Sequence, residues 1–363
     1  MKQRTVGLAA VLWLCLPYVL TGCLDEVAAP AHDVPRPQAA MIPGTFSLGG
    51  IPGLLAEGRA VNSAGAVTGV VGSSVHPYPF VPFLWVSDVF TPLPAPVGAS
   101  TSGAAGISES GLIAGTSVID DILRATIWQD GIPALLFGPE RFSTATGVGP
   151  AGHVVGTTWV AGNVGNTQAT FVYYNGTITI LPVPPEISRV HPVAANSSGH
   201  VLGDAHTSSN ERRVILWRDG QVHVIASPDG SSVNSVGGLT DAGDVVFSSG
   251  VGRLYRWRDG LTELLPIPDS AVSFDLTDVA PGGAVLGHVE HPFGIDNYGV
   301  WANGHFYYLK LPTDARVEAL AISDGYITGS YNFEEHAFRV RFEVPRAAGR
   351  SPCRRQCDRR NDR

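Results

Sequence analysis

Residues 104–115 read Ala-Ala-Gly-Ile-Ser-Glu-Ser-Gly-Leu-Ile-Ala-Gly, and residues 125–131 read Ala-Thr-Ile-Trp-Gln-Asp-Gly. The first stretch places two short apolar runs around a Ser-Glu-Ser-Gly turn, which is typical of two paired strands. The second is a strand that ends on Asp-Gly, a dipeptide that tolerates positive φ at both corners of a type I′ turn. Residues 132–136 continue that hairpin. Together these residues predict a unit of four antiparallel strands.

Both signals recur along the chain. The motif Gly-x-[Val/Ile/Leu]-x-Gly begins at Gly65, Gly111, Gly152, Gly199, Gly283 and Gly325, and a degenerate copy begins at Gly243. An aromatic residue with Gly three places later alternates with it, at Trp128, Tyr173, Trp217, Trp257 and Trp301, while Trp85 and Phe338 keep the aromatic residue alone. The leading glycines are 46, 41, 47, 44, 40 and 42 residues apart. Seven such units predict an all-β fold, a β-propeller of seven four-stranded blades.

The ends of this repeat predict how the ring closes. The seventh unit stops near Val344 after its third strand, and Thr45-Phe46-Ser47-Leu48 precedes the first unit. We therefore expect the N-terminal strand to complete the last blade and remove the open sheet edges. Small residues on the innermost strands suit the crowded axis, and we expect the tryptophans to pack between blades rather than to stack on sugars.

The first 22 residues predict an export signal. Lys2 and Arg4 precede an uncharged apolar stretch from Val6 to Leu20, which is short for a membrane span. The stretch ends Leu20-Thr21-Gly22-Cys23, which resembles the bacterial lipobox, so Cys23 is the expected site of lipidation. By this resemblance the protein is exported and lipid-anchored at the cell envelope, with outer-membrane delivery permitted by Leu24. Residues 23–43 then predict a Pro/Ala-rich tether.

Charge is distributed unevenly along the chain. Between Leu24 and Pro345 there are 15 Lys plus Arg and 30 Asp plus Glu, so the predicted propeller, residues 44–345, is acidic. This balance argues against a nucleic-acid partner, because phosphate binding needs a basic face. Residues 346–363 carry seven arginines and predict a disordered basic tail. Cys353 and Cys357 in that tail could form a disulfide in an oxidising compartment.

The repeat unit A-x-x-[VI]-[NS]-x-x-G-x-[VI]-x-G, followed by [AF]-x-[LI]-W-x-[DN]-G, resembles the HAF-type repeat of bacterial extracellular proteins. The resemblance covers residues 45–344. It implies export and a repeat architecture, and it carries no established activity. Kelch, WD40 and sialidase repeats match less well, because their signature residues are absent from the units.

Enzymatic motifs are scarce. The body holds a single lysine, Lys310, and has no P-loop, no G-x-S-x-G elbow and no H-E-x-x-H motif. The densest His and carboxylate groups, 288–291 and 334–336, lack the ligand spacing of a helical metal site, and we read them as solvated loops. No metal or other cofactor is therefore expected.

Topology nevertheless points to one face of the ring. If each unit runs from the axis outward, the short uniform turns lie on one face and the variable connections lie on the other. Variable loops on a rigid scaffold are where function concentrates. The candidate binding residues on those loops are His76, Tyr78, Asp120, Asp121, Trp159, His206, Arg212, Glu290, His291, Asp296, Glu334 and His336.

Two hypotheses of function remain. In the first, the protein is a monomeric, non-catalytic module that binds a glycan, a peptide or a protein. In the second, it is a propeller hydrolase or lyase whose acidic residues on the variable face act as general acid and base. A close carboxylate pair deep in the central pocket favours the enzyme, and carboxylates spread around the rim favour binding.

Overall fold

The computed structural model describes residues 40–42, 44–51, 54–73, 80–162, 165–269, 271–291, 297–309, 317–331 and 336–343. All of them belong to one compact unit, residues 37–363. The described residues form strands, turns and bends but no helix, and so none that could cross a membrane.

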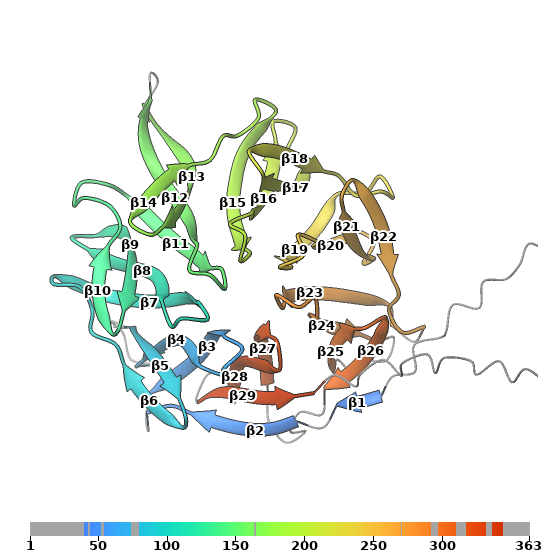
Figure 1. Ribbon diagram of the computed structural model, residues 1–363, viewed down its shortest axis with the longest axis horizontal. Helices are drawn as coiled ribbons and strands as arrows, with labels where there is room; N and C mark the ends of the chain where they lie inside the picture. Colours follow the sequence, from blue (N-terminus) through green and yellow to red (C-terminus); the bar gives the residue numbers. More distant parts are fainter. Residues whose placement is uncertain are drawn as a thin grey trace, which may run out of the picture. The chain divides into compact units, whose positions relative to one another are not determined.

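Seven antiparallel sheets follow one another around a central axis and form the predicted seven-bladed β-propeller (Figure 1). Blades 1 to 3 contain β3 (Leu55–Val61), β4 (Val67–Gly72), β5 (Val81–Val86), β6 (Val89–Pro92); β7 (Ala99–Ile107), β8 (Ile113–Ile119), β9 (Ile122–Gln129), β10 (Ile132–Leu135); and β11 (Ser143–Val148), β12 (Val154–Gly162), β13 (Gly165–Tyr174), β14 (Thr177–Ile180). Blades 4 and 5 contain β15 (Ile187–Ala195), β16 (Val201–Thr207), β17 (Arg212–Arg218), β18 (Gln221–Ile225); and β19 (Val233–Leu239), β20 (Val245–Ser249), β21 (Leu254–Arg258), β22 (Leu261–Leu265). Blade 6 contains β23 (Ser273–Val279), β24 (Val285–Glu290), β25 (Asn297–Ala302), β26 (His305–Leu309), and blade 7 contains β27 (Val317–Ser323), β28 (Tyr326–Tyr331), β29 (His336–Phe342).

The ring closes as predicted. Strand β2 (Gly44–Gly49) pairs antiparallel with β29, from Gly44 opposite Phe342 to Gly49 opposite Ala337, and supplies the fourth strand of blade 7. A short strand that we did not predict, β1 (Ala40–Ile42), adds to blade 6 in parallel with β26. It lies inside residues 23–43, which the composition had assigned to the tether, because the parallel pairing is made with residues far away in sequence.

Two kinds of glycine explain the repeat motif. The first glycine of each motif sits in the turn between the two inner strands with positive φ, for example 86° at Gly111, where an L side chain is strained. The second lies against the innermost strand, so that a Cβ at Gly115 would approach the carbonyl oxygen of Gly103 to 2.0 Å. The Asp-Gly corners also behave as expected, with φ of 53° at Asp130 and 78° at Gly131.

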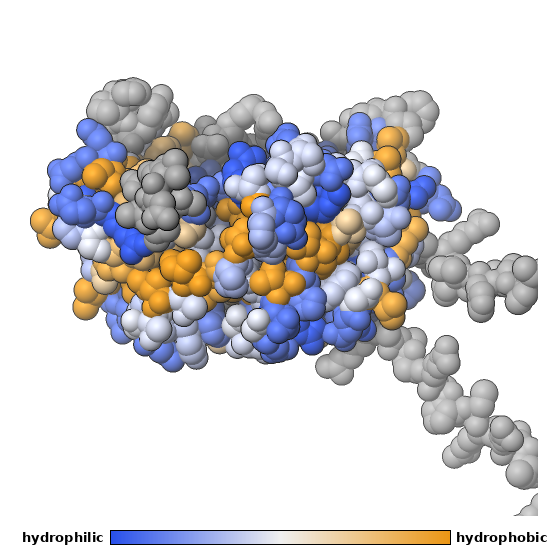
Figure 2. All heavy atoms as spheres, turned by 90° about the horizontal axis from the view of Figure 1, so that it is seen from above, coloured by the Kyte–Doolittle hydropathy of each residue, from blue (hydrophilic) through white to orange (hydrophobic). Residues whose placement is uncertain are grey.

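The core lies between blades, and the repeated tryptophans fill it. Trp128 of blade 2 packs with Leu93 of blade 1, and Trp217 of blade 4 packs in one cluster with Val155 of blade 3. Each blade therefore buries its aromatic residue against the preceding one, as predicted. The outermost strands, by contrast, leave apolar side chains at the rim, which Figure 2 shows between polar ones; Leu261 of β22 is 78% exposed.

The connections between the second and third strands are shorter than we expected. The predicted loop around Asp120 and Asp121 is a two-residue corner in which both residues have positive φ, 50° and 60°. The predicted loop 159–168 belongs largely to β12 and β13, which pair as far as Gly162 opposite Gly165. Long cross-strand pairing extends these hairpins through polar residues that carried no clear strand signal in the sequence.

Candidate functional site

The strand order gives the ring two distinct faces. Turns between the first and second strands and between the third and fourth strands lie on one side, which we call the turn face. Connections between the second and third strands, and from one blade to the next, lie on the other, which we call the loop face. The innermost strands β3, β7, β11, β15, β19, β23 and β27 surround the axis between them (Figure 1).

Every innermost strand carries a β-bulge at the same height. The pairing with the second strand shifts register next to the second motif position, as between Gly58 and Ala60 or between Ala104 and Gly106. A bulge leaves one extra residue unpaired and turns its side chain out of the ladder. The seven extra residues are Arg59, Ala105, Thr146, Val193, Gly237, Thr277 and Leu320, and all seven line a central cavity of about 250 Å³.

A second ring of residues lies one step nearer the loop face, and we call it the mouth ring. It consists of Glu57, Gly103, Thr144, His191, Ser235, Asp275 and Glu318, each paired with the residue after the second motif position. Asp275, Glu318 and Glu57 occupy consecutive blades, 6, 7 and 1, and their strands are in contact. Arg59 Nε donates to Glu57 Oε1 at 2.7 Å, so Glu57 is paired, and the exposed carboxylates of Asp275 and Glu318 make this side of the mouth acidic.

Blade 4 lies across the ring from these carboxylates (Figure 1) and carries basic side chains. Arg189 and His191 of β15 are both exposed. Arg212 of β17 donates two hydrogen bonds to Asp204, from Nε to Oδ1 at 2.8 Å and from Nη2 to Oδ2 at 2.7 Å. It also donates to the carbonyl of Asn234 in blade 5. His206 pairs directly with Arg212, so two predicted site residues are brought together.

Asp278 is the one charged residue at its register on the innermost strands, where the other blades have Gly or Ala. It lines the central cavity, and burial raises its pKa to about 7. Its two oxygens are already used: Oδ1 accepts from the backbone N–H of Val279 and Oδ2 from that of Ile322 in blade 7, both at 2.8 Å. The carboxyl therefore joins blades 6 and 7.

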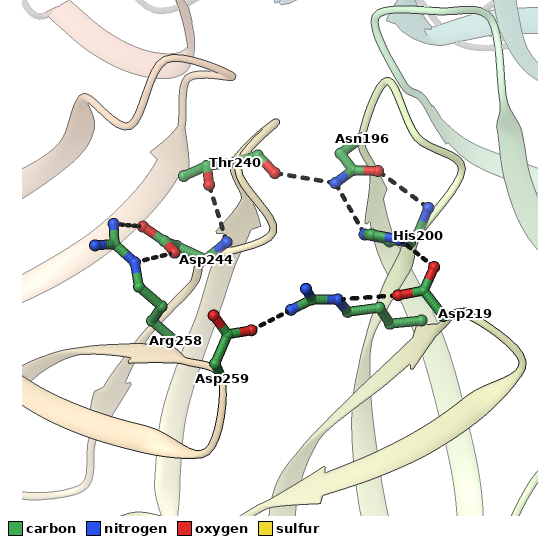
Figure 3. A network of polar contacts seen from close by, with 8 residues as sticks. Asn196, His200, Asp219, Thr240, Asp244, Arg258 and Asp259 are labelled. Carbon is green, nitrogen blue, oxygen red and sulfur yellow. Dashed lines mark hydrogen bonds and ion pairs between the residues drawn. The ribbon is translucent and has the colours of Figure 1, made fainter.

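The turn face is closed by bonds between neighbouring turns. Asn196 of blade 4 donates from Nδ2 to the carbonyl of Thr240 in blade 5 at 3.1 Å (Figure 3). Next to it the backbone N–H of Ser197 donates to Asp241 Oδ1 at 2.9 Å. Gly282 makes the same bond to Asp324 at 3.0 Å, and burial, aided by the negative charges of Asp241 and Glu109, raises the pKa of Asp324.

The remaining predicted residues are spread around the loop face. Trp159 packs edge-on against Phe142, with ring centroids 4.4 Å apart. Glu290 accepts from Ser273 Oγ at 2.8 Å, and His291 lies 3.2 Å from the hydroxyl of Tyr308. His336 stacks with Tyr331. The predicted residues His76, Tyr78, Asp296 and Glu334, together with Cys23, Cys353 and Cys357, lie outside the described residues.

Sequence reasoning missed the residues that form the channel. Arg59, Asp275, Asp278 and Glu318 lie on innermost strands, whereas the predicted binding residues were on the loops. Alignment of the units on their second motif position identifies Arg59, Asp275 and Asp278, because each is charged where most other units carry a small, apolar or neutral polar residue. Glu318 aligns only if one gap is allowed, because the last unit is one residue shorter there. Among the described residues, no three His, Cys, Asp or Glu side chains come close enough together to hold a metal ion.

Comparison with known proteins supports the fold. No protein-family profile matches the chain, and no curated protein sequence is similar to it. Among solved structures, YCF48 bound to D1 peptide aligns with a TM-score of 0.52 at 14% identity over 85% of this chain and 99% of that one. A puromycin-hydrolysing peptidase of Mycobacterium tuberculosis aligns with a TM-score of 0.54 at 13% identity, over 81% of this chain and 53% of that one. At such identities the likeness extends to the β-propeller fold alone.

Proposed function

We propose that this protein is an exported, lipid-anchored β-propeller that binds a peptide or protein segment at the channel mouth on its loop face. The observation that carries the proposal is the charge pattern of the innermost strands. Asp275, Glu318 and Glu57 lie at one height on three consecutive blades, and Arg189 and His191 lie on blade 4 across the ring. Such a mouth suits a ligand that carries both signs of charge, as a polypeptide does.

The form of the cavity agrees with binding at the mouth rather than deep inside. The bulge residues project into the channel and leave a cavity of about 250 Å³. This volume is below the usual range for a small-molecule pocket. A surface ligand can still rest on the ring of polar side chains above it. One of the structural neighbours, YCF48, was solved with a peptide, so the fold is compatible with such a partner.

The alternative, a hydrolase or lyase, has less support. Asp278 has the raised pKa that a general acid needs and lies in the cavity. Both of its oxygens accept backbone hydrogen bonds, however, so the carboxyl has a structural use in joining two blades. The mouth carboxylates lie at the rim, on one side of the channel, and not as a pair deep in the cavity, which favours binding over catalysis.

Export and anchoring belong to the same proposal. They rest on the apolar leader, on Leu20-Thr21-Gly22-Cys23 and on the resemblance of the repeat to the HAF type of extracellular proteins. Replacing Cys23 with Ser should release the protein from the membrane fraction or leave it unprocessed, with no incorporation of a palmitate analogue. Labelling of the Cys23→Ser protein would contradict the assignment of the anchor.

The binding proposal is tested with ligands selected on the mature chain. A displayed library of random peptides is enriched on the protein, and the best peptide is titrated by fluorescence anisotropy against a variant with Glu57→Gln, Asp275→Asn and Glu318→Gln. We expect the affinity to fall by about tenfold or more, and the loss to shrink at high salt.

A matched control removes three carboxylates from the turn face instead. Asp130→Asn, Asp219→Asn and Asp259→Asn change the net charge equally, and asparagine tolerates the positive φ of these corners. This variant should bind normally. Equal loss in both variants points to net charge rather than to the mouth, and a glycan array that gives ligands where the peptide library gives none overturns the proposal.

A further inference from the structure

Two of the tryptophans between blades are held by the same hydrogen bond. Trp128 Nε1 donates to the carbonyl of Pro94 at 2.8 Å, and Trp217 Nε1 donates to that of Pro182 at 2.6 Å. Each acceptor is the first proline of a Leu-Pro-x-Pro segment, residues 93–96 and 181–184, that leaves the outermost strand of the preceding blade. An indole N–H can only donate a hydrogen bond. At both positions its acceptor is the carbonyl of a proline.

Blade 6 has the tryptophan, and the blade before it has the Leu-Pro-x-Pro segment, but the hydrogen bond between them is missing. Blade 5 ends in a third Leu-Pro-x-Pro segment, residues 265–268, and Trp301 follows in blade 6. Trp301 is only 6% exposed, yet its Nε1 has no hydrogen-bond partner among the described residues. A buried donor without an acceptor is destabilising, so an added carbonyl acceptor would bind favourably at this position.

The two halves of the missing contact line the same groove. A cavity of about 700 Å³ between blades 5 and 6 is lined by both Pro266 and Trp301, and it reaches the first turns of both blades on the turn face. Leu264 on its edge is 58% exposed. The guanidinium of Arg256 lies over the indole, 5.7 Å from the ring centre.

The wall of blade 5 is held in place by an ion pair. Arg258 donates from Nε to Asp244 Oδ1 at 2.6 Å, and its second nitrogen bonds the other oxygen (Figure 3). The nitrogen of Asp244 is tied in turn to Thr240 Oγ1 at 3.0 Å. These groups are saturated, so they form a rigid side of the groove and leave the Trp301 indole as its unsatisfied polar group.

We infer that the groove between blades 5 and 6 binds an extended, proline-containing peptide segment whose main-chain carbonyl accepts the hydrogen bond of Trp301 Nε1. Leu-Pro-x-Pro segments of this chain already do so at Trp128 and Trp217. A polyproline II segment is preformed, and aromatic grooves are its usual receptors. The exposed Leu264 offers the apolar contact, and the proposed binding requires Arg256 to leave the indole and its ion pair with Glu263 so that the carbonyl can enter. This site is separate from the channel mouth.

The probe is a fluorescein-labelled peptide with the sequence of residues 91–98, Thr-Pro-Leu-Pro-Ala-Pro-Val-Gly, titrated against the full mature chain by anisotropy. We expect saturable binding, a loss of about tenfold or more for Trp301→Phe, and a similar loss for Leu264→Gln, since a buried aromatic donor and its apolar neighbour are typical hot-spot groups. A peptide with every proline replaced by alanine should bind several-fold more weakly.

Trp217→Phe is the matched control. It removes the same N–H from an indole that has its acceptor, so it should lower the melting temperature and leave peptide binding unchanged. Both substitutions shrink a buried ring and lower the melting temperature, but Trp301→Phe should lower it less, because it breaks no hydrogen bond. Equal thermal losses in both variants, peptide binding insensitive to Trp301→Phe and Leu264→Gln, or equal binding of the alanine peptide each overturn the inference. The channel-mouth variant with three neutralised acids should bind this probe normally, which separates this site from the proposed function.

Discussion

The two faces of the propeller differ in how strongly they join neighbouring blades and in how much their connections vary. On the turn face neighbouring blades are joined by side chains that cap each other's turns: Asn62 Nδ2 donates to the carbonyl of Ser108, and Asn196 Nδ2 to that of Thr240, both at 3.1 Å. On the loop face the hairpins differ from blade to blade, from the corner at Asp120–Asp121 to the long strands β12 and β13. Because one face carries the bonds between blades, the other can vary without opening the ring.

One pair of turn-face bonds occurs at blade 2 and again at blade 5. Glu109 of blade 2 accepts from the N–H of Ser63 at 3.0 Å and donates its own N–H to the carbonyl of Pro150 at 3.0 Å. Asp241 of blade 5 accepts from Ser197 and donates to Pro281, both at 2.9 Å. Blades 1 to 3 and blades 4 to 6 thus use equivalent residues, and blade 7 completes the ring with the help of β2.

Loss of the closing strand should have the largest effect, since it opens both faces at once. Deletion of residues 44–49 removes all six pairs between β2 and β29 and exposes a sheet edge. We expect a loss of about 5 kcal/mol or more in the free energy of unfolding, or failure to fold, because closure joins the first blade to the last. Denaturant unfolding measures it, and deletion of Ala40–Ile42 is the milder control. An unchanged denaturation midpoint would show that closure does not depend on β2.

Asp278, which lines the central cavity between the two faces, should make the stability of the protein depend on pH. Burial raises its pKa to about 7, whereas the unfolded carboxyl titrates near 3.8, so the folded state holds the proton more tightly. Stability attributable to this group is therefore full below about pH 4 and falls by about 2–4 kcal/mol as the pH rises through 7. Asp278→Asn should flatten the decline. A variant whose unfolding still weakens as steeply between pH 4 and pH 7 would assign the effect to other carboxyls.

Single substitutions on the turn face should cost less, and they sharpen the contrast between the faces. Asp241→Ala removes the acceptor of the Ser197 N–H, and we expect a loss of about 1 kcal/mol in unfolding free energy. Asp241→Asn retains an acceptor oxygen and should recover most of it. Neither variant should alter binding of a ligand selected on the loop face. Weakened binding with normal stability would mean that the two faces had been assigned the wrong way round.

The smallest effect on stability is expected at the mouth. His191 is exposed on β15, and His191→Ala should change the unfolding free energy by less than about 0.5 kcal/mol. Its effect on binding should be larger, a several-fold loss of affinity for a peptide selected on the mature chain. Thermal melting and anisotropy measured on the same preparation test both halves of this prediction, and a variant that melts early but binds normally contradicts it.

Much of the architecture could be read from local chemistry. The spacing of Gly111 and its counterparts predicted the number of blades, Asp130–Gly131 predicted a type I′ corner, and residues 45–48 predicted the closing strand. These features depend on the backbone preferences of a few adjacent residues, so they can be predicted from the sequence. The tryptophans were also predictable as core, because a large side chain repeated once per unit must lie at a repeated interface.

The functional surfaces depend on contacts between residues far apart in the chain. The bulges that turn Arg59 and Thr277 into the channel arise where an inner strand pairs with its neighbour, and the sequence of a single unit does not predict them. Pro266 and Trp301 have the same local sequence as their bonded counterparts, yet only the packing of blades 5 and 6 leaves the indole without its acceptor. Short-range preferences therefore suffice for the repeat, whereas the ligand sites follow from small differences in how the repeats pack.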